Sequence, residues 1–152
     1  MMDSDSFTGG CLCGAVRYEA KGEPCDSLIC HCRMCQRASG APITALLFMT
    51  ADHLKITKGQ TRTLVFSPRC NRQICDACGS PLFITRHTRP DMRAIYVGSL
   101  DDPRGFEPNL HVCVSSAMGW LDIRDNLPRH TEKPNGYTPT LQYDPTTGEM
   151  RI

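Results

Sequence analysis

The segment Cys30-His31-Cys32-Arg33-Met34-Cys35 decides how this chain folds, because three of its six residues are cysteines at spacings of two and three. Cysteine thiolates are soft ligands that suit zinc, and zinc sites recruit cysteines in short, closely spaced groups. Three cysteines supply three of the four ligands of a tetrahedral ion. A closed structural site takes the fourth ligand from the protein, whereas a reactive site leaves that position to water or substrate. The functional question is therefore whether this triad is open.

The chain has ten cysteines in 152 residues, a heavy load for one domain of this length. In a secreted protein such cysteines would form a disulfide framework. Residues 1–10 are polar and acidic and lack the apolar segment of a secretory signal. The spacings C-x-C, C-x-C-x-x-C and C-x-x-C instead indicate metal ligation. We therefore expect a cytoplasmic, zinc-binding protein.

Charge and hydropathy exclude two classes of partner. The chain has 17 Lys and Arg against 16 Asp and Glu, without a basic run. A surface that follows phosphates is therefore not expected, and neither is nucleic-acid binding. The longest apolar run, around residues 45–49, is far too short to cross a membrane.

Two more cysteine motifs flank the triad in the sequence: Cys11-Leu12-Cys13, bracketed by glycines, and Cys75-Asp76-Ala77-Cys78. In an extended segment, residues i and i+2 face the same way, so both sulfurs of the first motif can reach one ion. The glycine after the second motif allows a tight turn in which backbone N–H groups face the sulfurs.

Spacing alone leaves two pairings open. In one, Cys32 and Cys35 join Cys75 and Cys78 in a ribbon-like site. In the other, the two flanking motifs form a closed four-cysteine site, and the triad holds a second ion. The second pairing uses all seven motif cysteines, and we prefer it for that reason.

Short strands punctuated by Gly and Pro predict a mainly β fold with few short helical turns. We expect residues 1–8 to be frayed and a helical turn at 36–39. The main domain should span residues 1–130, and a polar C-terminal extension, 131–152, should be either a hairpin (140–143 with 149–152) or a mobile tail. Strands are expected at 15–20, 27–30, 43–50, 54–57, 61–67, 81–85, 93–97 and 111–115.

Several segments resemble the glutathione-dependent formaldehyde-activating (GFA) family, which includes the domain of centromere protein V. The resemblance runs in register over about residues 8–130. One departure is Val112-Cys113, where relatives often have an apolar–aromatic pair, and it bears on pocket shape and substrate. The matching segments are Gly9–Tyr18, Cys30–Gly40, Cys75–Phe83, Gly98–Pro103 and His111–Trp120.

The resemblance implies an Mss4-like fold of antiparallel sheets with two zinc ions per chain. One zinc would be structural, and the other would lie at the reactive triad. The implied activity is a zinc-dependent carbon–sulfur lyase that acts on thiol–aldehyde adducts of the S-hydroxymethylglutathione class, with a small thiol such as glutathione and an aldehyde as partners. The alternative is a non-enzymatic, zinc-stabilised interaction module, and a homodimer remains an option. The implied ligands are Cys11, Cys13, Cys75 and Cys78 for the structural ion and Cys30, Cys32 and Cys35 for the reactive one.

Further candidates lie outside the zinc motifs. His111 is the candidate catalytic proton shuttle, although a hydrogen-bonded, half-buried imidazole is an equally good interpretation. His31 should make a structural hydrogen bond. Trp120 should belong to the core, with an aromatic wall for a ligand as the alternative. The remaining cysteines, expected to be packing or surface thiols, are Cys25, Cys70 and Cys113; the first two are the alternatives for capping the second zinc.

Overall fold

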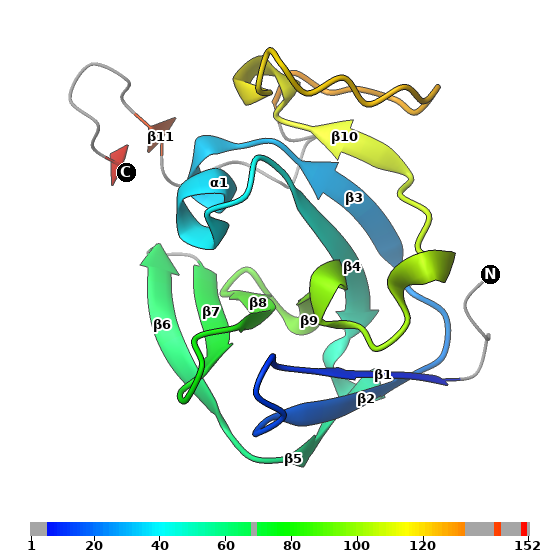
Figure 1. Ribbon diagram of the computed structural model, residues 1–152, viewed down its shortest axis with the longest axis vertical. Coiled ribbons are helices and arrows are strands. Elements are labelled where there is room, and N and C mark those ends of the chain that lie inside the picture. Colours follow the sequence, from blue (N-terminus) through cyan, green and yellow to red (C-terminus); the bar gives the residue numbers. More distant parts are fainter. Residues whose placement is uncertain (1–5, 68–69, 133–141, 144–149, 152) are drawn as a thin grey trace. The chain divides into compact units, whose positions relative to one another are not determined.

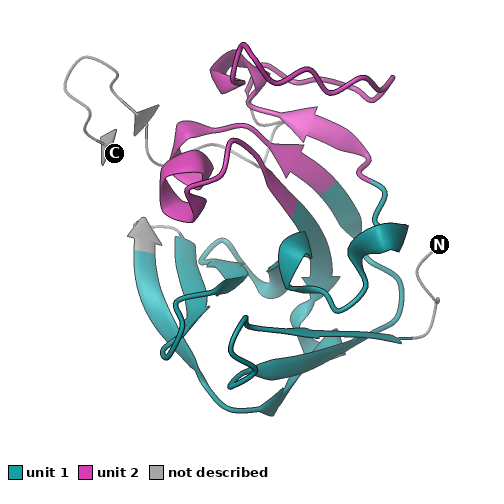
Figure 2. Cartoon of the chain, in the orientation of Figure 1, with its two compact units in different colours: residues 1–27, 46–107 teal, residues 28–45, 108–152 magenta. Residues whose placement is uncertain are grey.

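The computed structural model describes residues 6–67, 70–132, 142–143 and 150–151. It contains two compact units, which Figure 2 shows in different colours. Unit 1 comprises residues 1–27 and 46–107, and unit 2 comprises residues 28–45 and 108–152. Strands dominate the described residues, so the predicted mainly β class is confirmed.

The first sheet of unit 1 has three antiparallel strands in the order β1-β2-β5. They are β1 (Ser6–Gly10), β2 (Arg17–Lys21) and β5 (Leu54–Lys58). The prediction of a frayed start through residue 8 was wrong for residues 6–8, because these residues pair with β2. Residues 1–5 lie outside the described part of the chain.

The second sheet has seven strands, and the five that lie wholly or mostly in unit 1 follow the order β4-β9-β8-β7-β6, with antiparallel neighbours (Figure 1). Short 3-10 turns, η1 (Ala51–His53), η2 (Val97–Ser99) and η3 (Pro103–Gly105), connect the strands of this unit. The strands are β4 (Thr44–Thr50), β6 (Thr61–Ser67), β7 (Cys70–Cys75), β8 (Pro81–Arg86) and β9 (Arg89–Tyr96).

The core of unit 1 centres on Tyr18 and Phe83, whose rings meet edge to face with centroids 4.9 Å apart. The Tyr18 hydroxyl also shares a 2.7 Å hydrogen bond with the Ser99 hydroxyl. A Cβ atom on Gly9 would lie 2.3 Å from that Tyr18 oxygen, so only glycine fits there. This packing holds β1 in place beside the loop that contains the first cysteine motif.

Strand β7 was not predicted from the sequence. Its residues are mostly polar, and polar runs lack the alternation that marks a half-buried strand. The structure shows that Arg72 of β7 is buried and that its guanidinium lies 5.7 Å from the centre of the Tyr96 ring. A cation–π contact therefore takes the place of an apolar core residue in this strand.

Among the described residues of unit 2 are an α-helix and a parallel strand pair. Strand β3 (Asp26–Cys30), whose last three residues belong to this unit, pairs with β10 (Leu110–Val112) in parallel, with Val112 opposite Cys30. Helix α1 (Arg33–Ser39) begins after Cys32 and ends at Gly40, which has φ 72°. The helix is longer than the predicted turn at 36–39.

Strand β10 is shorter than the predicted strand at 111–115. It stops at Val112 because Cys113 adopts a left-handed conformation with φ 59° and ψ 38°. The turn η4 (Val114–Ser116) follows. The prediction that Trp120 belongs to the core was wrong, because this side chain is 73% exposed.

Within the C-terminal extension, β11 (Gln142–Tyr143) pairs antiparallel with β12 (Met150–Arg151). The other residues of the predicted hairpin lie outside the described part of the chain. Among the described residues, no helix is long and apolar enough to cross a membrane.

Candidate metal centres

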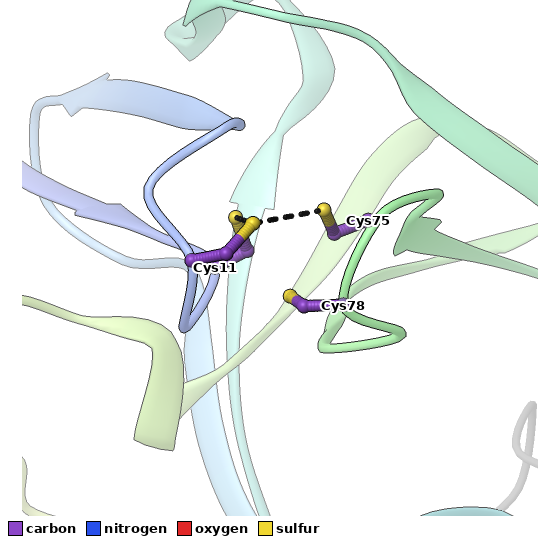
Figure 3. A group of neighbouring side chains, drawn as sticks. Cys11, Cys75 and Cys78 are labelled. Atoms are coloured by element: carbon purple, nitrogen blue, oxygen red, sulfur yellow. Dashed lines mark hydrogen bonds between the residues drawn. The ribbon is translucent and has the colours of Figure 1, made fainter.

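A four-cysteine cluster lies in unit 1, where two turns meet. Cys11 and Cys13 come from the loop after β1, Cys75 ends β7, and Cys78 comes from the turn between β7 and β8. Their four sulfurs all lie within 4.8 Å of one another. Figure 3 shows the Cys11, Cys75 and Cys78 sulfurs converging. The structure thus groups these cysteines as in the second of the two pairings.

The sulfur spacing fits a tetrahedral zinc ion. The Cys11 and Cys13 sulfurs are 3.6 Å apart, and the Cys13 and Cys75 sulfurs are 3.8 Å apart. Zinc–sulfur bonds of about 2.3 Å give a tetrahedron with edges of about 3.8 Å. The four side chains can therefore act as ligands without rearrangement of the backbone.

Hydrogen bonds around this cluster favour the thiolate forms of Cys11 and Cys78, whereas at Cys13 the Ala15 N–H acts to lower the pKa but the neighbouring sulfurs, chiefly that of Cys11, outweigh it and raise the pKa to about 11. The Val16 N–H donates to the Cys11 sulfur at 3.2 Å, and the Cys78 sulfur lies 3.1 Å from the Ser80 hydroxyl. The Ser80 hydroxyl and its backbone N–H lower the pKa of Cys78 to about 5. The pKa of Cys11 is also lowered: burial acts to raise it, but hydrogen bonding, chiefly from Val16, outweighs burial. Because zinc binds thiolates, these contacts prepare the cluster for the ion.

A second cluster lies in unit 2 and consists of the three cysteines of the central motif. Cys30 ends β3, Cys32 caps the N-terminus of α1, and Cys35 lies in its first turn. Their sulfurs lie within 4.8 Å of one another. The Cys32 sulfur accepts a hydrogen bond from the Cys35 N–H at 3.3 Å, so the helix cap itself fixes part of the arrangement. The donor set suits zinc and provides three sulfurs rather than four.

A chain of hydrogen bonds starts from the residue between Cys30 and Cys32. His31 Nε2 lies 2.9 Å from His111 Nδ1, and His111 Nε2 lies 2.9 Å from Asp125 Oδ2. His31 and His111 are 5% and 1% exposed, respectively, so the hydrogen bond between them is shielded from water, whereas the bond to Asp125 is partly buried. Both ring nitrogens of His111 are therefore already bonded within the protein.

Hydrogen bonding and burial set the protonation states of Asp125 and His31 in this chain of hydrogen bonds. The hydrogen bond from His111 lowers the pKa of Asp125 to about 2, and burial lowers the pKa of His31. At neutral pH Asp125 is therefore ionised, and His31 is neutral. When His111 is neutral as well, its Nε2–H donates to Asp125 and its Nδ1 accepts from His31 Nε2–H. His31 Nδ1 is then a buried lone pair without a hydrogen-bond partner among the described residues.

The sequence did not predict that Asp125 and Cys113 would lie in this region of the structure. Asp125 lies in a polar stretch 14 residues after His111, and no motif marks it. Cys113 is 3% exposed, and its nearby thiol lowers the pKa of Cys30. The departure of Val112-Cys113 from the family pattern was the sequence feature that could have marked Cys113. Neither Cys25, which is exposed, nor Cys70 belongs to either cluster.

A mainly β fold with two cysteine clusters suited to zinc is typical of a class of small zinc-binding proteins. Residues 6–116 match the family described as glutathione-dependent formaldehyde-activating enzyme, and the chain belongs to this family. Three chains of solved structure also match. One, a protein of Rhodobacter sphaeroides, is 27% identical over 66% of this chain and 91% of its own length, with a TM-score of 0.50. No curated protein matches this chain.

Proposed function

We propose that this protein is a zinc-dependent carbon–sulfur lyase that acts on thiol–aldehyde adducts of the S-hydroxymethylglutathione class. The observation that carries the proposal is the difference in ligand number between the two clusters. The cluster in unit 1 offers four sulfurs and the cluster in unit 2 offers three. A tetrahedral ion in the first is closed by protein, whereas an ion in the second has room for a substrate atom. Family membership supports the same assignment.

The three sulfurs that would hold the reactive ion are those of Cys30, Cys32 and Cys35. A zinc ion there would lower the pKa of a small thiol and hold it as the thiolate. Cys30 and Cys35 are buried, and Cys32 is partly exposed. We therefore place the approach of the reactants on the Cys32 side of the triad.

The reaction moves one proton and two electron pairs. In the cleavage direction, the O–H bonding pair of the adduct hydroxyl becomes the second bond of the aldehyde C=O, the C–S bonding pair leaves with the sulfur, and the released thiolate takes up the hydroxyl proton. Formation of the adduct is the reverse. No oxidant or reductant takes part, which fits a site made of thiols and imidazoles.

The chain of hydrogen bonds from His31 through His111 to Asp125 supports this site by holding the ligand-bearing segment in place. Because both ring nitrogens of His111 are bonded, direct proton transfer by His111 would require one of those bonds to break. His111 instead holds His31, which lies between two of the proposed ligands, and Asp125 fixes the His111 tautomer. Such outer partners orient the segment that contains the ligands. We assign His111 as a positioning residue.

A binding experiment tests the proposal. Glutathione and S-methylglutathione are titrated calorimetrically into the zinc-loaded protein. Glutathione should bind at least about tenfold more tightly, because only its sulfur can ionise. The Cys32→Ser variant should lose this preference and the Cys25→Ser variant should keep it. Turnover of formaldehyde with glutathione, followed by NMR, then identifies the reaction. Equal affinity for the two compounds would reject the lyase.

The second candidate is the non-enzymatic, zinc-stabilised interaction module. One observation favours it: the side chain of Cys113 lies against Cys30. A permanent fourth sulfur would close the second centre as completely as the first, and a closed centre is structural. The role of Cys113 therefore separates the two candidates.

A further inference from the structure

Cys113 lies where strand β10 meets the cysteine triad. Val112 is paired with Cys30 across the parallel strands, and its carbonyl oxygen accepts the His31 N–H at 3.0 Å. The next residue, Cys113, is almost fully buried, and its thiol is close enough to Cys30 to lower the pKa of that cysteine. A fourth thiol thus lies directly beside one of the three proposed ligands.

The backbone at Cys113 is held in an uncommon conformation. Cys113 is the one non-glycine residue with positive φ among those the structure describes. Residues with a Cβ atom rarely adopt this conformation, and when they do the surrounding structure holds them there. Here the Val114 N–H donates to the His130 carbonyl at 3.1 Å, and the Ser116 N–H donates to the Cys113 carbonyl at 3.0 Å. The turn that ends β10 therefore fixes the backbone from which this thiol projects.

We propose that Cys113 supplies the fourth sulfur to a zinc ion held by Cys30, Cys32 and Cys35, and that an incoming thiol replaces it. This inference rests on the proposed function of the same site. The Cys113 sulfur lies beside Cys30 and outside the group of three sulfurs within 4.8 Å of one another. Rotation about its Cα–Cβ bond is the movement that brings it into and out of the ligand shell.

Replacement of Cys113 is balanced in atoms and charge. The bond from the metal to the Cys113 sulfur breaks, and a bond to the incoming sulfur forms. The proton lost by the incoming thiol passes to the departing Cys113 thiolate. Wild-type protein should therefore bind a thiol without releasing a proton to the solvent. Without the Cys113 thiol, the same binding should release about one proton.

This difference provides the test. Zinc-loaded wild type, Cys113→Ala and the control Cys25→Ala are titrated with glutathione in buffers of different ionisation enthalpy. We expect about zero protons released for wild type and the control, and about one for Cys113→Ala. Cys113→Ala should also bind glutathione at least about tenfold more tightly, because the internal competitor is gone.

The outcomes separate the two proposals. If wild type and Cys113→Ala both release about one proton, the thiol site stands and the role of Cys113 is rejected. If neither releases a proton but glutathione is still preferred over S-methylglutathione, Cys113 is again rejected as the exchanged ligand. If glutathione and S-methylglutathione bind equally to both proteins, the proposed function itself fails.

A second measurement uses wild type alone, in case the variant does not retain its second ion. Cadmium-113 replaces zinc, and its NMR chemical shift reports how many sulfurs surround each ion. We expect two signals in the four-sulfur range for the resting wild type. One four-sulfur signal with one three-sulfur signal would overturn the proposal.

Discussion

Replacement of Cys11 by serine should destabilise the protein more than replacement of Cys32 by serine. A serine hydroxyl at position 11 can still accept the Val16 N–H, so the main loss is one metal ligand. An ion in the four-cysteine cluster joins segments far apart in sequence, because Cys13 and Cys75 are 62 residues apart. An ion held by the triad alone, as in a Cys113→Ala background, joins residues no more than five positions apart, from Cys30 to Cys35.

The size of the difference follows from chain entropy. By the relation used for cross-links, closure of a loop of 62 residues removes about 4 kcal/mol of conformational entropy from the unfolded chain, and closure of a loop of five residues removes about 2 kcal/mol. The Cys11→Ser variant should therefore lose about 2 kcal/mol more than the Cys32→Ser variant. For a domain of 152 residues this corresponds to a melting temperature lower by about 4–8 °C.

Urea unfolding and thermal melts of zinc-saturated, reduced protein measure this difference, with both serine substitutions made in the Cys113→Ala background and zinc content determined on the same samples. The Cys25→Ser variant is the control, because Cys25 is exposed and belongs to neither cluster, and its stability should stay within about 0.5 kcal/mol of wild type. Equal losses for Cys11→Ser and Cys32→Ser would refute the division into a structural and a reactive centre.

Three further results are expected. Elemental analysis should find about two zinc ions per wild-type chain and about one in Cys32→Ser; one ion in fully loaded wild type would contradict two centres. His111→Phe should lower the free energy of unfolding by about 2–4 kcal/mol, because it removes two hydrogen bonds and leaves a buried imidazole nitrogen without its partner. His53 is exposed, so the control His53→Phe should change the free energy of unfolding little. Similar losses for His111→Phe and His53→Phe would argue against the hydrogen-bond chain through His111. Gly59→Ala should cost about 1–3 kcal/mol more than Gly40→Ala in chemical unfolding, since both have positive φ but only at Gly59 would a Cβ lie 2.1 Å from a backbone oxygen.

The sequence by itself determined the class of fold and the seven cysteines that form the two clusters. Strand β6 was predicted with the bounds that the structure shows, because its residues and the turns beside it follow local rules. The triad is also a local feature: Cys30, Cys32 and Cys35 share one strand end and one helix cap. Backbone geometry within six residues is enough to bring such sulfurs together.

Only the tertiary structure decided which distant groups meet. Both pairings of the cysteine motifs satisfy ligand spacing, and the contact of Cys13 with Cys75 depends on how the strands of unit 1 are ordered. The contacts of His31 with His111 and of Cys30 with Cys113 depend on the parallel register of β3 and β10. Local propensity does not encode a register between strands about 80 residues apart, because that register is set by burial summed over the whole sheet.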